Sequence, residues 1–139
     1  MPTLYWVDTS AWVFALRPNA HKRIRQRIDQ LLADGTAAVC GQVMLELLSG
    51  ARTELEFARR RNRLLALQLL PTEEDDWLQA ARLGFSMRRL GITVAHADIL
   101  LSALSIRHNA ILLHADRHFD RVAQHLPIPV ESWADAVQS

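Results

Sequence analysis

The segment Leu4-Tyr5-Trp6-Val7-Asp8-Thr9-Ser10 places an aspartate and two hydroxyl side chains directly after four mainly apolar residues. A short apolar run indicates a buried β-strand, and hydroxyl side chains after it are typical of a helix start. The segment Ile111-Leu112-Leu113-His114-Ala115-Asp116 repeats the apolar run and the aspartate near the other end of the chain. The sequence therefore predicts two buried strands, each followed by an acid.

Short apolar runs alternate with helical patterns along the whole chain. We expect strands at 4–7, 37–40, 110–114 and 128–130, and helices at 11–16, 21–32, 41–50, 53–67, 72–90, 97–108 and 119–126. Buried strands separated by helices form parallel sheets that are covered on both faces. The predicted fold class is therefore α/β, a three-layer α/β/α sandwich with a central parallel sheet. Ligands of such sheets bind beyond the carboxyl ends of the strands, where Asp8 and Asp116 fall.

The bulk composition is that of an ordinary globular protein, with 50% hydrophobic and 22% charged residues in 139. This length predicts one domain, 1–139, without a disulfide or zinc to stabilise it. The chain has no apolar run near the ~18 residues of a membrane span and no cationic leader ahead of an apolar core. The single cysteine, Cys40, is expected to be a small buried apolar residue. We therefore expect a cytoplasmic protein that does not bind membranes.

The basic residues are unusual in type and position, although the formal net charge is only +1. Fifteen of the sixteen are arginine, and Lys22 is the only lysine. Residues 17–63 contain ten basic and five acidic side chains, a local surplus of five positive charges. Arginine binds phosphate with two parallel hydrogen bonds, so this stretch suits a polyanion such as nucleic acid. The alternative is a solvated helix face, with Glu56 paired to Arg59 or Arg60.

Two further acids interrupt apolar helical segments, Glu46 within 41–50 and Asp98 at the start of 97–108. Each of the four acids has a possible local role. Asp8 and Asp116 could cap the helices that follow them, Asp98 could stabilise the positive end of its helix, and Glu46 could belong to a polar surface stripe. If the fold brings all four together, their charges would raise one another's pKa, and a divalent cation would resolve this conflict.

Four segments of the chain, taken in order, resemble a known family. They are Val7-Asp8-Thr9-Ser10-Ala11, Glu46-Leu47-Leu48-Ser49-Gly50, Ala97-Asp98-Ile99-Leu100-Leu101-Ser102-Ala103 and Leu112-Leu113-His114-Ala115-Asp116-Arg117-His118-Phe119. Together they look like the signature segments of PIN-domain ribonucleases, especially the VapC-type toxins of toxin–antitoxin pairs. The resemblance runs from residue 4 to about residue 130.

The resemblance implies a PIN-like fold and a metal-dependent endoribonuclease that leaves a 5′-phosphate and a 3′-hydroxyl. The implied catalytic residues are Asp8, Glu46, Asp98 and Asp116. Of these, the three aspartates would bind Mg²⁺ or Mn²⁺, which suit hard oxygen ligands, and Glu46 would complete the cluster or orient the attacking water.

The resemblance also implies an RNA substrate, a cognate antitoxin protein and a homodimer. Ser10 could contact the metal shell or a phosphate. The residues expected to bind the RNA backbone lie in the arginine-rich stretch: Arg59, Arg60 and Arg63.

Two residues depart from the family pattern, since His114 stands where a hydroxyl residue is frequent and His118 where a further acid is frequent. They could be transition-metal ligands or residues around the site. A receiver-type signalling domain also gathers acids at a sheet edge, but it needs a lysine after a late strand, and Lys22 lies early in the chain. The remaining alternative is a PIN-fold RNA-processing nuclease, or an inactive RNA-binding module, that is not a toxin.

Overall fold

The expected strands form the centre of one sheet in the computed structural model, which describes residues 3–138. Its five strands are parallel and lie in the order β3-β2-β1-β4-β5. Their bounds are β1 (Tyr5–Val7), β2 (Ala37–Val39), β3 (Gln68–Leu69), β4 (Ile111–His114) and β5 (Val130–Ser132). The predicted parallel sheet is confirmed.

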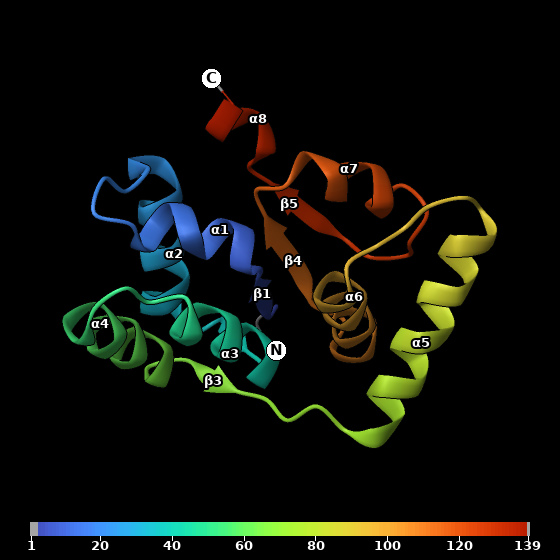
Figure 1. The fold of residues 1–139 in the computed structure, drawn as a ribbon, viewed down its shortest axis with the longest axis horizontal. Helices are drawn as coiled ribbons and strands as arrows, with labels where there is room; N and C mark the ends of the chain where they lie inside the picture. Colours follow the sequence, from blue (N-terminus) through green and yellow to red (C-terminus); the bar gives the residue numbers. More distant parts are fainter. Residues whose placement is uncertain (1–2, 139) are drawn as a thin grey trace.

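Helices connect the strands and cover both faces of the sheet. They are α1 (Thr9–Leu16), α2 (Lys22–Asp34), α3 (Gly41–Ser49), α4 (Glu54–Leu65), α5 (Glu74–Arg89), α6 (His96–His108), α7 (Arg117–Ala123) and α8 (Ala134–Gln138). Figure 1 shows α1 to α4 on one side of β1 and β4, and α5 to α7 on the other. The chain is therefore the three-layer α/β/α sandwich that the sequence predicts.

The layers enclose one apolar core, in which Trp6, Trp12 and Phe119 are among the largest fully buried side chains. Cys40 is buried within the same core, as predicted. Local signals set several helix ends: Gly35 adopts φ 68 after α2, and Gly91 adopts φ 80 just beyond α5. Positive φ at these positions favours glycine because a Cβ would clash with the backbone.

The structure also differs from the predicted elements in several details. Helix α5 begins at Glu74, after a capping box made by Glu73 and Asp76, and not at residue 72. The last strand lies at 130–132 and not at 128–130. Strand β3 and helix α8 were not expected; both are very short, and both β3 side chains are exposed.

The order of the strands determines where a site can form. The chain builds outward from β1 to β2 and β3, then crosses to the opposite side of β1 to add β4 and β5. Neighbouring β1 and β4 therefore form the topological switch point, where open α/β sheets bind ligands. Val7 pairs with Leu113 in the register, and the Asp8 N–H donates to the Leu113 carbonyl at 2.9 Å. The strand ends that precede Asp8 and Asp116 thus lie side by side.

Candidate active site

The two strand-end acids occupy defined positions at the switch point. Asp8 is 6% exposed and caps α1, with Oδ2 accepting from the Ser10 N–H at 3.2 Å and from the Ser10 hydroxyl at 2.6 Å. Asp116 caps α7, and its Oδ1 accepts from the His118 N–H at 2.9 Å. The capping role considered from the sequence is therefore present at both. In each case one carboxylate oxygen makes the capping bonds, and the other accepts no hydrogen bond from residues 3–138.

The Ser10 hydroxyl links the two strand ends. It donates to Asp8 and accepts from the Ala115 N–H at 3.0 Å. A side chain from the start of α1 thus holds the backbone just after β4 and fixes the orientation of the Asp8 carboxylate. The expected contact of Ser10 with metal or phosphate stays a prediction, and sequence reasoning missed this bridge because it crosses 105 residues.

Glu46 reaches the same place from α3. The Thr9 hydroxyl donates to Glu46 Oε1 at 3.4 Å, so the residue directly after Asp8 contacts the second acid. Burial, followed by the negative charge of Asp8, raises the pKa of Glu46 above its ordinary value. The polar stripe considered from the sequence therefore does not describe Glu46 fully. The only sequence signal for Thr9 was its place in the Asp-Thr-Ser run.

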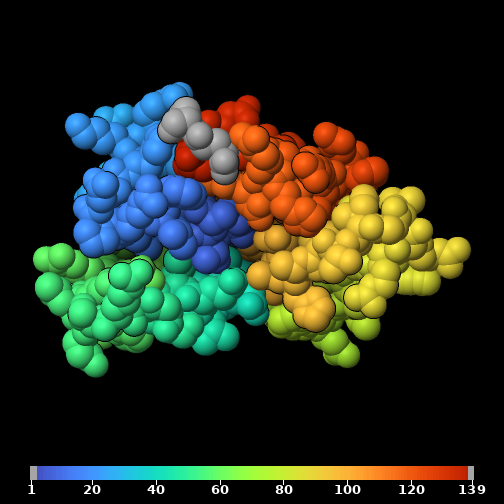
Figure 2. Space-filling view, turned by 45° about the horizontal axis from the view of Figure 1, so that its top comes forward, coloured from blue at the N-terminus to red at the C-terminus, as the bar shows by residue number. Residues whose placement is uncertain are grey.

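Asp98 comes to the cluster from the first turn of α6. Burial and then the charges of Asp8, Asp116 and Glu46 raise its pKa to about 7. Within the described part of the chain, no hydrogen-bond donor and no basic side chain contacts its carboxylate. Figure 2 shows the start of α1 in blue beside the teal α3 and the orange segments of α6 and α7. The structure thus brings the four predicted acids into one electrostatic cluster.

The side chains of the two histidines near Asp116 both make hydrogen bonds with backbone groups. His114 is fully buried, and its Nδ1 accepts from the Asp116 N–H at 3.2 Å. Its Nε2 lies 3.3 Å from Asp120 Oδ1, too poorly aligned for a hydrogen bond, and burial lowers its pKa. The His118 Nε2 donates to the Thr93 carbonyl at 3.1 Å. Both side chains therefore support the site backbone.

The three predicted RNA-binding arginines of α4 differ from one another. Arg60 pairs with Glu56 at 2.7 Å and also donates to the Leu47 carbonyl, and Arg63 pairs with Asp29. The helical ion pair considered from the sequence is therefore present. Arg59 is exposed and has no ion pair among the residues described.

The chemistry of the donor set fits a divalent cation. Four carboxylates from four elements repel one another, and an oxygen-only set suits Mg²⁺ or Mn²⁺ better than softer metals. Residues 3–138 contain no group of three Asp, Glu, His or Cys side chains already in position around one ion. Mg²⁺ commonly uses only one or two carboxylates and keeps several waters, so it does not require three protein ligands already in position.

The parallel sheet with an acidic cluster at its switch point defines an α/β protein with a candidate phosphodiesterase site. The model of the PIN domain family matches residues 5–124, and the chain belongs to this family.

Similar proteins share both sequence and fold with this chain. Ribonuclease VapC11 of Mycobacterium tuberculosis is 35% identical over 124 residues, which cover 85% of this chain and 90% of the relative. Ribonuclease VapC18 of the same species is 28% identical over 132 residues, covering 92% and 93%. A chain in the crystal structure of VapBC2 from Rickettsia felis bound to a promoter DNA fragment has a TM-score of 0.77 at 19% identity. That match covers 94% of this chain and 99% of the other, and it shows the shared fold.

Proposed function

We propose that this chain is an RNA-cleaving PIN-domain hydrolase, a metal-dependent endoribonuclease that serves as the toxin of a type II toxin–antitoxin pair. The relatives named ribonucleases support cleavage of RNA. The observation that carries the metal dependence is Asp98, a partly buried acid without a cation partner among residues 3–138 and with a pKa raised by three other acids. A buried carboxylate in such surroundings needs a positive charge to ionise at low cost.

Each acid has a proposed role. Asp8, Asp98 and Asp116 would hold Mg²⁺ or Mn²⁺, which when bound lowers the pKa of a water molecule and neutralises charge on the phosphate. Glu46 would orient the attacking water. Ser10 holds Oδ2 of Asp8 through its hydroxyl, which leaves Oδ1 available to a cation.

The surface that binds the RNA backbone is also a proposal. Arg59 is free to contact phosphate, because it is exposed and makes no ion pair in the described part of the chain. A phosphate that reaches Arg60 or Arg63 would have to replace Glu56 or Asp29. We expect these two contacts to contribute less to binding than Arg59. Such contacts position the substrate and weaken as salt rises.

The proposed partners follow from the similar structures. Several of these are described as VapBC complexes, some of them bound to DNA. We therefore propose a cognate antitoxin protein for this chain. The resemblance to VapC-type toxins further leads us to propose a homodimer and a cytoplasmic location. None of the described helices is both long and apolar enough to cross a membrane.

A cleavage assay on defined single-stranded RNA tests the proposal. The wild-type chain should cut the RNA in Mg²⁺ or Mn²⁺, and cutting should stop when a chelator is added. The cut ends can then be sequenced, and their end groups can be determined. Asp98→Asn should reduce the rate at least 100-fold, whereas Asp34→Asn, at an exposed position on α2, should leave it unchanged. Metal-dependent cutting that survives Asp98→Asn would contradict the site.

Expression in cells separates a toxin from an RNA-processing enzyme. We expect wild-type expression to arrest growth, and co-expression of the small neighbouring gene to relieve the arrest. The Asp98→Asn variant should not arrest growth. Cleavage in vitro without any arrest of growth would favour a processing enzyme.

A further inference from the structure

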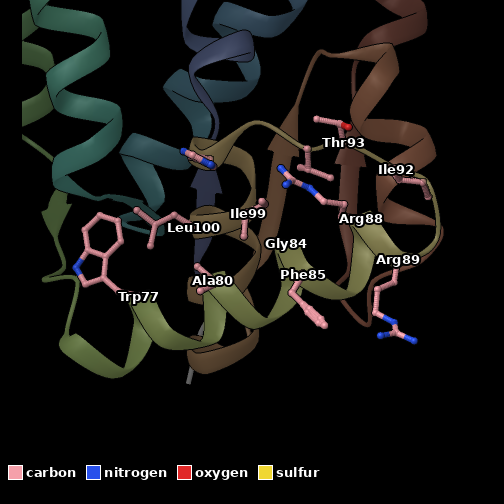
Figure 3. A pocket seen from close by; sticks show the side chains of 13 residues that line it. Trp77, Ala80, Gly84, Phe85, Arg88, Arg89, Ile92, Thr93, Ile99 and Leu100 are labelled. Carbon is pink, nitrogen blue, oxygen red and sulfur yellow. The ribbon is translucent and has the colours of Figure 1, made fainter.

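A hollow of about 680 Å³ lies between α5, α6 and the loop that joins them. Its size falls within the range of about 300–1,000 Å³ that is usual for small-molecule sites. Figure 3 shows Gly84 of α5 close to Ile99 of α6 within the hollow. A Cβ on Gly84 would lie 2.9 Å from Ile99 Cδ1, so the two helices approach closely here. None of the four acids of the active site lines this hollow.

Exposed aromatic rings mark α5 beside the hollow. Trp77 is 54% exposed and Phe85 is 45% exposed. They are eight residues apart on α5, and both line the hollow. The guanidinium groups of Arg82 and Arg89 each lie 5.6 Å from the Phe85 ring centre. An exposed ring beside cations is a platform on which nucleic-acid bases stack.

The charges that line the hollow have one sign. Arg88 and Arg89 line it, and the lining contains no Asp or Glu. Neither arginine has an ion pair among residues 3–138. Figure 3 shows Arg88 directed toward Thr93, with Arg89 at the outer edge. Two unpaired guanidinium groups beside an aromatic surface suit a phosphate that is joined to a base.

Two residues that line the hollow are linked to acids of the active site. His96 lines the hollow and begins α6, and Asp98 follows it within the first turn. Thr93 lines the hollow as well, and its carbonyl accepts from His118, whose N–H donates to Asp116. Asp98 is therefore linked to the hollow through the first turn of α6, and Asp116 is linked to it through His118.

We propose that this hollow, the α5–α6 subsite, binds an unpaired nucleotide next to the phosphodiester bond that is cut, with its base on Phe85 and its phosphate on Arg88 and Arg89. The inference rests on the proposed ribonuclease function and adds a preference for single-stranded RNA. A base within a duplex is stacked on its neighbours and cannot reach the ring.

Binding is measured with the full-length Asp98→Asn chain and a fluorescent single-stranded oligoribonucleotide by fluorescence anisotropy. We expect Phe85→Leu, which keeps an apolar side chain but removes stacking, to weaken binding about tenfold. Arg88→Gln should weaken it about threefold to tenfold and lessen its salt dependence. Phe85→Trp should bind as well as Phe85 does. A matched duplex should bind more weakly and should not respond to Phe85→Leu.

Two control variants test whether the effect is local. Leu78→Ala removes an apolar side chain that is 62% exposed on α5 and does not line the hollow. Arg121→Gln removes a charge from an exposed position on α7. Both should keep the affinity within twofold. Equal affinity in Phe85→Leu, Arg88→Gln and the controls would overturn the subsite.

Two further results separate the subsite from its alternatives. If Phe85→Leu changes the oligomeric state that sedimentation measures, the hollow is a protein interface and the subsite is wrong. If RNA binds and responds to these variants but the wild-type chain does not cleave it, the subsite stands and the ribonuclease proposal fails. If the wild-type chain cleaves RNA but binding does not respond to Phe85→Leu or Arg88→Gln, the ribonuclease proposal stands and the subsite fails.

Discussion

Replacing Asp98 by asparagine is expected to stabilise the folded chain above pH 7 when divalent cations are absent. The ordinary pKa of an aspartate is 3.8, whereas the pKa of Asp98 in the folded chain is about 7. Well below pH 3.8 both the folded and the unfolded chain carry the proton, so the charge has no effect on stability. As the pH rises toward 7, the unfolded chain loses the proton first, and the folded state becomes progressively less stable.

The magnitude follows from the two pKa values. A rise from 3.8 to about 7 corresponds to about 4 kcal/mol at 1.36 kcal/mol for each pKa unit. Because Asp98 is partly exposed, we expect asparagine to recover about 2–4 kcal/mol of this above pH 7. Because the charges of the other three acids act on Asp98, its loss of a proton is coupled to theirs, and the change of stability with pH should be broad.

Urea unfolding of both proteins in chelator, at intervals from pH 4 to pH 8.5, measures this effect. Burial lowers the pKa of His108 and His114, so both proteins should also lose stability as the pH falls below about 6.5. That loss is common to both and cancels in their difference. The difference should be smallest at pH 4 and largest above pH 7. A difference that is independent of pH, or absent at pH 8, would refute the reasoning.

Three further substitutions test contacts described above. Ser10→Ala should cost about 1–2 kcal/mol of unfolding free energy and slow RNA cleavage about tenfold, while Ser10→Thr keeps both, as measured by urea unfolding and initial rates. Arg107→Leu should cost about 3–5 kcal/mol because it leaves the buried Asp76 unpaired, and adding Asp76→Asn should recover part of this in a double-mutant cycle. Gly84→Ala gains about 1 kcal/mol of helix propensity and loses about 1–3 kcal/mol to overpacking, so its thermal midpoint should fall unless Ile99→Val makes room.

The sequence predicted the centre of the sheet well because β1, β2 and β4 are short, apolar and mostly buried. The structure confirms the strands that precede Asp8 and Asp116, and parallel pairing explains why these acids meet. The edge of the sheet was less predictable. Strand β3 has two residues with exposed side chains, and only its backbone pairing with β2 defines it.

The convergence of the four acids could be predicted from the sequence, but the contacts that support them could not. The cluster formed by Asp98 and the other acids agrees with the family pattern. The Ser10 bridge to the Ala115 N–H depends on a register that no local pattern encodes. The ion pair between Arg63 and Asp29 joins two helices, and no local sequence pattern predicts it either. Long-range hydrogen bonds of this kind require the fold to be known.

The pairing of β1 with β4 has a consequence for how the chain is made. The partners of residues 5–7 lie at 111–113 and are synthesised more than 100 residues later. Until then β1 lacks one of its two neighbours, and Asp116 has not been synthesised. The acidic cluster can therefore assemble only after residue 116 has been made, and we expect nascent chains that have not reached it to have no ability to degrade the message from which they are translated.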